Sequence, residues 1–307
     1  MMEKIVELLR KAVVSDTASN STVRQVQYHP LDFGRWWPRL HPGVWAFAAL
    51  VFVGSLVLLR DGGRDWRNVM APAARAWWPA PWENAIPYPP YLGIILSPLG
   101  GLPSREATAI NNAAAVLIVA LVIRRFGGPW WGAAIVFLTP SGIWHFTNGQ
   151  TDWLALAGLL WFNGLDLVLF TLKPQVALWV AVSRLRRTGS AWWRYLAPTC
   201  FIAIASLIIW PLWPVHVARL GQAVIDDPYN ASLWPWSLPL GAFLVWKAWQ
   251  TGDDRYGLAA SPLLFPYVNW PSYIGLQALL VSCWPRLTLA AWAVMWVGGT
   301  LLFVLGS

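Results

Sequence analysis

The stretch VWAFAALVFVGSLVLL (residues 44–59) and the stretch RDGGRDWRNVMAPAARAWWPAPWENAIPYPP (residues 60–90) together decide the fold class of this chain. The first is an uncharged apolar run, close to the roughly 17–25 helical residues that cross the hydrocarbon of a membrane. The second is polar and carries three carboxylates, Asp61, Asp65 and Glu83. Together they predict a membrane-spanning helix followed by a long loop in water.

The composition of the whole chain extends this prediction. Of its 307 residues, 57% are hydrophobic and 12% are charged, and the mean hydropathy is +0.48. Soluble domains carry about a quarter charged residues, so this balance favours the membrane class. Apolar runs recur from Val44 to the C-terminus, and the 25 tryptophans fit belts at the water–lipid interface. We therefore predict an all-α polytopic membrane protein, a bundle of about eight to ten transmembrane or re-entrant helices with a long first exterior loop.

Residues 1–43 differ from the rest of the chain. Residues 2–14 place their apolar side chains on one helical face, which predicts an amphipathic helix on the membrane surface, and a polar linker follows. Six basic residues precede the first apolar run, and short basic segments tend to stay in the cytoplasm. We expect a cytoplasmic N-terminus, a transmembrane domain of residues 44–307 and an exterior loop of residues 60–90, in a multi-pass protein of the cell membrane.

Three of the remaining apolar runs predict membrane-spanning helices: Ala107–Ile123, Trp130–Ile143 and Leu196–Trp213. Further apolar runs follow towards the C-terminus: Leu238–Trp249, Leu258–Tyr267, Tyr273–Trp284 and Leu287–Leu305. Residues 91–102 are interrupted by proline and predict a re-entrant or interfacial segment, whose backbone needs protein or a wet cavity around it. The runs 153–162, 165–172 and 176–182 are each too short to span alone. Residues 214–235 predict a second exterior loop.

The distribution of charge and the missing motifs exclude several classes of function. The net charge is +8, but the basic residues are spread over short loops, so they indicate lipid headgroups rather than nucleic acid. The four histidines have no metal-ligand spacing, and the two cysteines lie in apolar runs. Glycine-rich motifs for nucleotides are absent. We expect membrane lipids as partners, and no metal, no cofactor and no nucleic acid.

Polar side chains within the apolar regions mark the candidate site, because such groups are costly in hydrocarbon and usually face a bundle interior or a wet cavity. Asp152 begins a helix, where the helix dipole favours a carboxylate; the alternative is a helix cap with hydrogen bonds between helices. Lys173 precedes a proline, either as a lysine that extends to the interface or as a cation held for a phosphate. The four arginines of loop 60–90 oppose the positive-inside rule: either the first span is inverted, or the arginines bind an anion or are solvated surface charges, with Arg60 as an anchor of the helix end.

Several motifs follow one another along the chain: Asp65-Trp66 with the alanine-rich residues 73–76, Tyr88-Pro89-Pro90 with Pro98-Leu99 and Leu102-Pro103, Gly149-Gln150-Thr151-Asp152, Lys173-Pro174-Gln175, and Ser261-Pro262-Leu263 with Trp270-Pro271. In this order they resemble glycosyltransferase family 87. Members of that family are GT-C-fold membrane enzymes related to mannosyltransferases that use polyprenol-phosphate-mannose. The resemblance covers about residues 44–285, and the interval from Gln150 to Lys173 is shorter than in the family.

The resemblance implies inverting transfer of a single sugar from a polyprenyl-phosphate donor to the hydroxyl of a glycolipid or glycan acceptor, on the non-cytoplasmic face. The sugar would be mannose or another hexose or pentose. Asp65 matches the family's general base, with Asp61 as the second candidate. The donor phosphate and the rest of the substrate are implied to contact a further set of residues: Lys173, Arg67, Arg75, Tyr88, Gln150, Asp152 and Gln175. The lipid-phosphate sugar is a substrate, so no cofactor is implied.

Two other functions stay open. Residues 262–271 form a proline-broken polar patch, and discontinuous helices often line substrate cavities in transporters. A transporter or flippase of a lipid-linked sugar is therefore the alternative. A non-catalytic membrane scaffold is the third, and it would have a closed first loop with no cavity between Asp65, Gln150 and Lys173.

Overall fold

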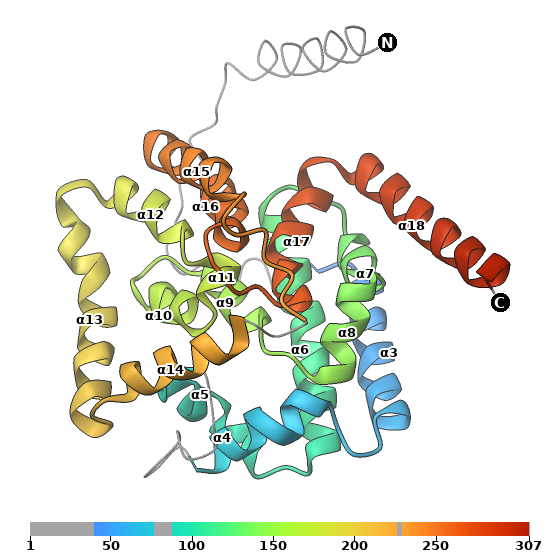
Figure 1. Ribbon diagram of the computed structural model, residues 1–307, viewed down its shortest axis with the longest axis horizontal. Helices are drawn as coiled ribbons and strands as arrows, with labels where there is room; N and C mark the ends of the chain where they lie inside the picture. Colours follow the sequence, from blue (N-terminus) through green and yellow to red (C-terminus); the bar gives the residue numbers. More distant parts are fainter. Residues whose placement is uncertain (1–39, 77–87, 226–228, 307) are drawn as a thin grey trace, which may run out of the picture. The chain divides into compact units, whose positions relative to one another are not determined.

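The computed structural model describes residues 40–76, 88–225 and 229–306, without the side chains of residues 221–224 and 298–306. Within these ranges the chain is helical, and its one β interaction is an isolated bridge between Asn230 and Asn269 (Figure 1). The predicted all-α class is therefore confirmed. The predicted surface helix of residues 2–14 and the carboxylate Glu83 lie outside the described residues.

The longer helices are α3 (Pro42–Leu58), α5 (Tyr91–Gly100), α6 (Ser104–Arg125), α13 (Trp192–Ile209), α14 (Trp213–Ile225), α15 (Leu238–Thr251), α17 (Ile274–Cys283) and α18 (Pro285–Gly306). The shorter ones are α4 (Ala71–Arg75), α7 (Gly132–Phe137), α8 (Pro140–Asn148), α9 (Trp153–Ala157), α10 (Leu165–Leu172), α11 (Pro174–Ala177), α12 (Val180–Thr188) and α16 (Asp254–Ala260). A π-helical turn covers Trp66–Met70, and 3-10 turns cover Gly158–Leu160, Gly189–Ala191, Ser261–Leu263 and Trp270–Tyr273.

Helix α6 lies in the core, where it packs against α3, α9 and α17. Its buried positions include Val116, Val119 and Val122, whose side chains belong to the main hydrophobic core. Helix α3 begins at a cap formed by His41, whose Nδ1 accepts a hydrogen bond from the Gly43 N–H at 3.0 Å. The apolar runs that predicted α3 and α6 thus mark both helices correctly to within a few residues.

The prediction of one helix over residues 130–143 is wrong. The chain forms α7 and α8 there, with a corner between them. Thr139 is extended, and its hydroxyl accepts a hydrogen bond from the Gly142 N–H at 3.0 Å. Pro140 then opens α8, at a position where no helical hydrogen bond requires the N–H that proline lacks. Gly142 permits the tight corner, because a side chain in its place would meet the backbone of Phe137.

The three short apolar runs form short helices, as their lengths predicted. They give α9 with its 3-10 turn, α10, and the pair α11 and α12. Helix α10 packs against α9 and α13, and α9 packs against α6. Gly164 starts α10 with a φ of 86°, and a β-carbon there would meet the Tyr195 carbonyl. Helices this short are held by tertiary packing and not by their own propensity.

Both predicted exterior loops contain helix. In residues 60–90, the π-helical turn leads into α4, and α4 packs against α5. In residues 214–235, the predicted loop is wrong over its first half, because α14 extends to Ile225. Helix α14 is amphipathic, with His216 and Arg219 among apolar residues. Its polar residues therefore interrupt the apolar run that would have predicted a helix.

Several helices carry apolar side chains that the rest of the chain does not cover. Leu58 of α3 is 78% exposed, Phe201 of α13 is 74% exposed and Val294 of α18 is 71% exposed. Helix α18 contacts α17 and α7, and Figure 1 shows it reaching away from them. By length and composition, two described helical stretches could cross a membrane: α6, which is mostly buried, and Val180–Ile209, which is mostly exposed and joins α12 to α13.

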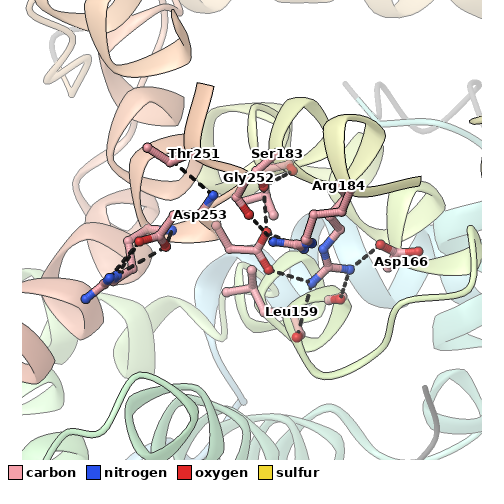
Figure 2. Close-up of polar contacts among 12 residues, drawn as sticks. Leu159, Asp166, Ser183, Arg184, Thr251, Gly252 and Asp253 are labelled. Atoms are coloured by element: carbon pink, nitrogen blue, oxygen red, sulfur yellow. Dashed lines mark hydrogen bonds and ion pairs between the residues drawn. The ribbon is translucent and has the colours of Figure 1, made fainter. Parts of the chain in front are cut away.

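A group of buried charges, here called the ion cluster, joins α6, α10, α12 and α16. Its central residue is Arg184 of α12, which is fully buried. The Arg184 guanidinium donates to the Asp166 carboxylate and to the carbonyls of Gly158 and Leu159, as Figure 2 shows for Asp166 and Leu159. The Tyr195 hydroxyl donates to the same Asp166 carboxylate at 2.8 Å. These bonds connect α12 to the beginning of α10 and to α13.

Asp254, the first residue of α16, is the second carboxylate of the ion cluster. It pairs with three guanidinium groups, at 2.7 Å to Arg187, 3.3 Å to Arg125 and 3.5 Å to Arg184. Burial alone would raise the pKa of Asp254, but the positive charges outweigh burial and hold this pKa below its ordinary value. The ion cluster is completed by Arg125, so it also holds the last turn of α6.

We predict that Asp254→Asn destabilises the fold by about 3–5 kcal/mol, because it leaves buried guanidinium groups without their counter-charge. Asp253→Asn is the matched control. Asp253 pairs with Arg255 at 2.6 Å through partly exposed side chains, and such pairs contribute about 0–1 kcal/mol. Asparagine also preserves the cap that Asp253 forms on α16. Denaturant unfolding followed by tryptophan fluorescence measures both variants, and equal losses would contradict this account.

Candidate functional site

Polar side chains from separate segments meet at the ends of short helices. Asp65 precedes the π-helical turn, and Gln150 and Asp152 lie between α8 and α9. Lys173 separates α10 from α11, and Ser272 lies in the 3-10 turn before α17. Each residue lies at a helix boundary, where the chain changes direction and distant segments can meet. We call these five residues the polar cluster.

Lys173 is at the centre of the polar cluster. Its ammonium donates to Asp152 Oδ2 at 2.7 Å and to Gln150 Oε1 at 2.8 Å, and the residue is only 3% exposed. Pro174 disfavours a helical conformation at the preceding residue, and Lys173 has φ −138° and ψ 81°. Of the two sequence-based alternatives for Lys173, the lysine that extends to the interface is therefore wrong, because the ammonium is buried and paired.

Asp152 is fully buried and bonds through both of its oxygens. Besides the Lys173 contact, its Oδ1 accepts a hydrogen bond from the Ser272 hydroxyl at 2.7 Å. Gln175 follows on α11, with its Nε2 3.5 Å from the same hydroxyl. Asp152 stands at the start of α9, as predicted, but its side chain makes no capping bond to that helix. Its carboxylate instead connects three segments of the chain.

Asp65 brings the first loop into the polar cluster. The Gln150 side-chain amide donates a hydrogen bond to Asp65 Oδ2. Asp65 is partly exposed and partly buried. Its burial raises the pKa of the carboxyl above the ordinary value of 3.8, and this effect is larger than the lowering by the positive charges of Lys173 and Arg64. A carboxyl group with a raised pKa at a partly open position is suited to accept a proton.

Two glycines allow the first loop to approach this closely. A β-carbon on Gly63 would lie 2.6 Å from the carbonyl carbon of Asn148. Gly149 has a φ of 67°, and an added β-carbon would lie 2.8 Å from Cβ of Trp66. The Gly63 N–H also donates to the Thr108 hydroxyl of α6 at 2.9 Å. A side chain at either glycine would push the first loop away from the polar cluster.

A cavity of about 580 Å³ borders the polar cluster. Tyr88 and Gln175 line it on the side of the cluster, and the Lys173 ammonium lies 5.4 Å from the centre of the Tyr88 ring. The rest of its wall comes mainly from α10, α13 and α14 and is mostly apolar. None of the five residues of the polar cluster lines this cavity, and Tyr88 and Gln175 are the lining residues that contact the cluster.

Three of the predicted site residues, Asp61, Arg67 and Arg75, lie neither in the polar cluster nor in the wall of this cavity. Arg67 pairs with Asp61 at 3.7 Å, and both side chains are exposed. Arg75 donates to the Gly100 carbonyl at 2.9 Å, at the C-terminal end of α5 where a cation is favourable. The expectation that Arg67 and Arg75 hold the donor phosphate stays a prediction, and in the structure each of them contacts another partner.

Two residues of the site escaped sequence-based prediction. Asn111 of α6 is fully buried, donates to the Gln150 carbonyl at 2.9 Å and accepts from the Trp153 indole at 2.8 Å. The sequence feature that could have identified Asn111 is its position inside an apolar run, because an amide side chain is costly in hydrocarbon unless it has a hydrogen-bond partner. Ser272 was missed because it follows the polar patch of residues 262–271 directly and has no charge of its own.

No protein-family model matches this chain, and no curated protein and no solved structure matches it either. In the part of the chain that the structure describes, no group of three or more histidine, cysteine, aspartate or glutamate side chains is placed to hold a metal ion. The resemblance to glycosyltransferase family 87 therefore stays a prediction that rests on the sequence motifs alone.

We predict that Lys173→Met lowers the free energy of unfolding by about 3–5 kcal/mol, because it leaves the buried Asp152 charge unpaired. Adding Asp152→Asn should recover a large part of this loss, since asparagine removes the charge and keeps an acceptor for Ser272. Lys247→Met on α15, which removes a lysine stacked 4.9 Å from the Trp246 ring, is the control and should cost about 1 kcal/mol or less. Denaturant unfolding measures all three, and a double variant less stable than Lys173→Met would contradict the pairing.

Proposed function

We propose that this chain is a polytopic membrane glycosyltransferase with a cytoplasmic N-terminus. It transfers one sugar, with inversion, from a polyprenyl-phosphate donor to an acceptor hydroxyl on the non-cytoplasmic face. One observation carries the proposal: a partly exposed carboxylate, Asp65, is joined through Gln150 to a buried lysine that lies beside an apolar cavity.

The outward-facing apolar side chains support a place in the membrane. Helices α3, α13 and α18 expose rows of leucine, isoleucine, valine and phenylalanine, whereas soluble monomers rarely expose large contiguous apolar patches. Trp192 and Trp193 at the start of α13 are also exposed, as expected for indole groups at a lipid interface. The short helices α9 to α11 suit membrane depth as well, because other helices cover their backbone.

Helix α6 supports the proposed orientation. Its 22 residues correspond to about 33 Å, roughly the thickness of membrane hydrocarbon. Near its beginning, Asn111 contacts the polar cluster, and at its end Arg125 belongs to the ion cluster. Further arginines lie next to the residues of the ion cluster in the sequence, among them Arg124 and Arg186. Because positively charged segments favour the cytoplasm, the polar cluster would face the exterior.

The polar cluster suits the chemistry of sugar transfer. In the proposed reaction, the acceptor oxygen attacks the anomeric carbon while Asp65 takes the hydroxyl proton. The bond between that carbon and the phosphate oxygen breaks, and the polyprenyl phosphate leaves with the bonding electrons. One displacement of this kind inverts the anomeric configuration. The Lys173 ammonium lies beside Tyr88 at the cavity wall, where a fixed positive charge would stabilise the leaving phosphate.

The cavity supports a lipid as the donor. Its volume of about 580 Å³ lies within the roughly 300–1,000 Å³ of typical ligand sites. Its apolar wall suits part of an isoprenoid chain. Its polar end is formed by Tyr88 and Gln175, which lie next to Lys173 and Ser272. A lipid phosphate at that end would lie close to the ammonium, with its chain in the apolar space.

Transport of a lipid-linked sugar is the second candidate function. The break between α10 and α11 at Lys173 lies beside the cavity, and discontinuous helices line substrate sites in transporters. A transporter would move the labelled lipid across a vesicle membrane without forming a new glycosidic bond. It would also tolerate the loss of Asp65, which a transferase would not.

We predict that Asp65→Asn lowers sugar transfer by about 10²–10⁴-fold, because the general base is lost. The assay uses the protein in lipid vesicles, polyprenyl phosphate carrying radiolabelled mannose, and extracted membrane glycolipids as acceptors. Asp61→Asn removes the exposed carboxylate of the same loop and should retain activity. Full activity of Asp65→Asn would contradict the role of this base. A wild-type protein that moves the lipid without forming a product would favour transport instead.

The raised pKa of Asp65 predicts the pH dependence of transfer. A general base acts in its ionised form, so activity is present above the folded pKa of this group and is lost as the pH falls through it. Since burial raises that pKa, the acid limb of kcat/KM should lie above pH 3.8. A pH–rate profile of kcat/KM at constant ionic strength measures the position of this acid limb. An acid limb at or below the ordinary value would contradict the burial of this carboxyl.

A further inference from the structure

We propose that Gln150 is a positioning residue that orients the Asp65 carboxylate, and that the Lys173–Asp152 ion pair holds Gln150 in the orientation required. This inference rests on the proposed role of Asp65 as the general base. It assigns Gln150 a task other than the substrate contact that the sequence motif implied. The catalytic group is Asp65, and Gln150 acts through it.

The charges on its two sides determine how the Gln150 amide is turned. The Lys173 ammonium can only donate hydrogen bonds, so the amide atom 2.8 Å away must be the oxygen. The amide nitrogen then faces Asp65 Oδ2, which as a carboxylate can only accept. A turned amide would place its NH2 group against the ammonium and its oxygen against the carboxylate. Both contacts would be repulsive, so one orientation is strongly preferred.

The backbone of Gln150 is held as firmly as its side chain. The Asn111 amide donates to the Gln150 carbonyl at 2.9 Å, and the Gln150 N–H donates to the His145 carbonyl at 3.1 Å. Gln150 is 2% exposed, so little of it is accessible to a substrate. The ammonium on its other side is itself fixed by Asp152, 2.7 Å away. Apart from the partly exposed Asp65, the groups that hold Gln150 are therefore buried and hydrogen-bonded.

This arrangement leaves one oxygen of Asp65 for the acceptor. Among the described residues, Gln150 supplies the side-chain hydrogen bond to Asp65, and it does so at Oδ2. The carboxylate is partly exposed, so Oδ1 remains for an incoming hydroxyl group. A base held at one oxygen loses less freedom when the acceptor binds, and small errors in the orientation of a reacting group cost large factors in rate. Gln150 would thus act on the chemical step rather than on binding.

The test measures the protonation of Asp65 directly, without any substrate. Dicyclohexylcarbodiimide attacks protonated carboxyl groups, so the labelling of Asp65 against pH, read by peptide mass spectrometry, has a midpoint at its apparent pKa. The groups that act on this pKa are Lys173, Arg64, Asp152 and Tyr88, together with the Gln150 hydrogen bond. Gln150→Leu removes the donor and should raise the midpoint by roughly one pH unit. Gln150→Glu adds a like charge and should raise it further.

Two further variants separate orientation from general damage. Gln277→Leu on α17 is the matched control and should leave the midpoint unchanged. The double variant Lys173→Met with Asp152→Asn removes the pair that holds the amide, and its midpoint should rise. Because the Lys173 charge acts on the Asp65 pKa more strongly than the Asp152 charge does, part of this rise is electrostatic. The same double change in a Gln150→Leu background should give a smaller rise, because only the electrostatic part remains there. Size-exclusion chromatography checks folding, and if Gln150→Leu does not fold, Gln150→Met, which is also uncharged and lacks the amide donor, decides the result.

Activity gives an independent readout. In the vesicle assay with polyprenyl-phosphate mannose, Gln150→Leu should lower kcat by about 10–100-fold with little change in KM, because Gln150 makes no substrate contact. An unchanged labelling midpoint in a folded Gln150 variant, or a loss confined to KM, would overturn the inference. If the midpoints shift but the wild-type protein transfers no sugar, Gln150 orients Asp65 as inferred and the proposed transferase function is the part that fails.

Discussion

A charge buried among apolar helices is stable only beside a partner, and this constraint governs the interior of the fold. Lys173 and Asp152 satisfy it in the polar cluster, and Arg184 with Asp166 and Asp254 satisfies it in the ion cluster. In both clusters the partners come from different segments, 21 residues apart for Lys173 and Asp152, 18 for Arg184 and Asp166, and 70 for Arg184 and Asp254. Each pair therefore determines which helices lie next to one another, because an unpaired arrangement would leave a charge without compensation.

The helix breaks that complicate the fold also create the site. Pro174 ends a helical conformation at Lys173, and Gly149 ends α8 with a positive φ. A continuous helix would have directed the Lys173 and Gln150 side chains to its own flank. At a break, the same side chains can meet in the space between segments. The interruption of regular structure is thus the reason that an amide, an ammonium and two carboxylates share one position.

Much of the helical architecture could be predicted from hydropathy, and the errors have physical causes. The runs that gave α3, α6, α13 and α17 are mostly apolar and carry no charged residue, so their helices follow from composition. The corner at Pro140 was missed because apolar residues continue through it. Helix α14 was missed because one of its faces is polar. Within the site, Asp152 and Lys173 stand out as polar groups in apolar surroundings, whereas Asp65, Gln150 and Gln175 were predicted from the resemblance of the motifs. Arg67 and Arg75 were predicted as well, and the structure gives them partners elsewhere.

The sequence alone determines the helical class and the membrane-like composition. It also identifies the small set of polar groups that lie among apolar residues. These are local properties, because hydropathy and proline breaks are read within one segment. Only the tertiary structure decided that Gln150 faces both Asp65 and Lys173, and that the cavity ends at Tyr88 and Gln175. Such contacts depend on how closely distant backbones approach. That approach rests on side-chain volume, as at Gly63 and Gly149, where one added carbon would separate the segments.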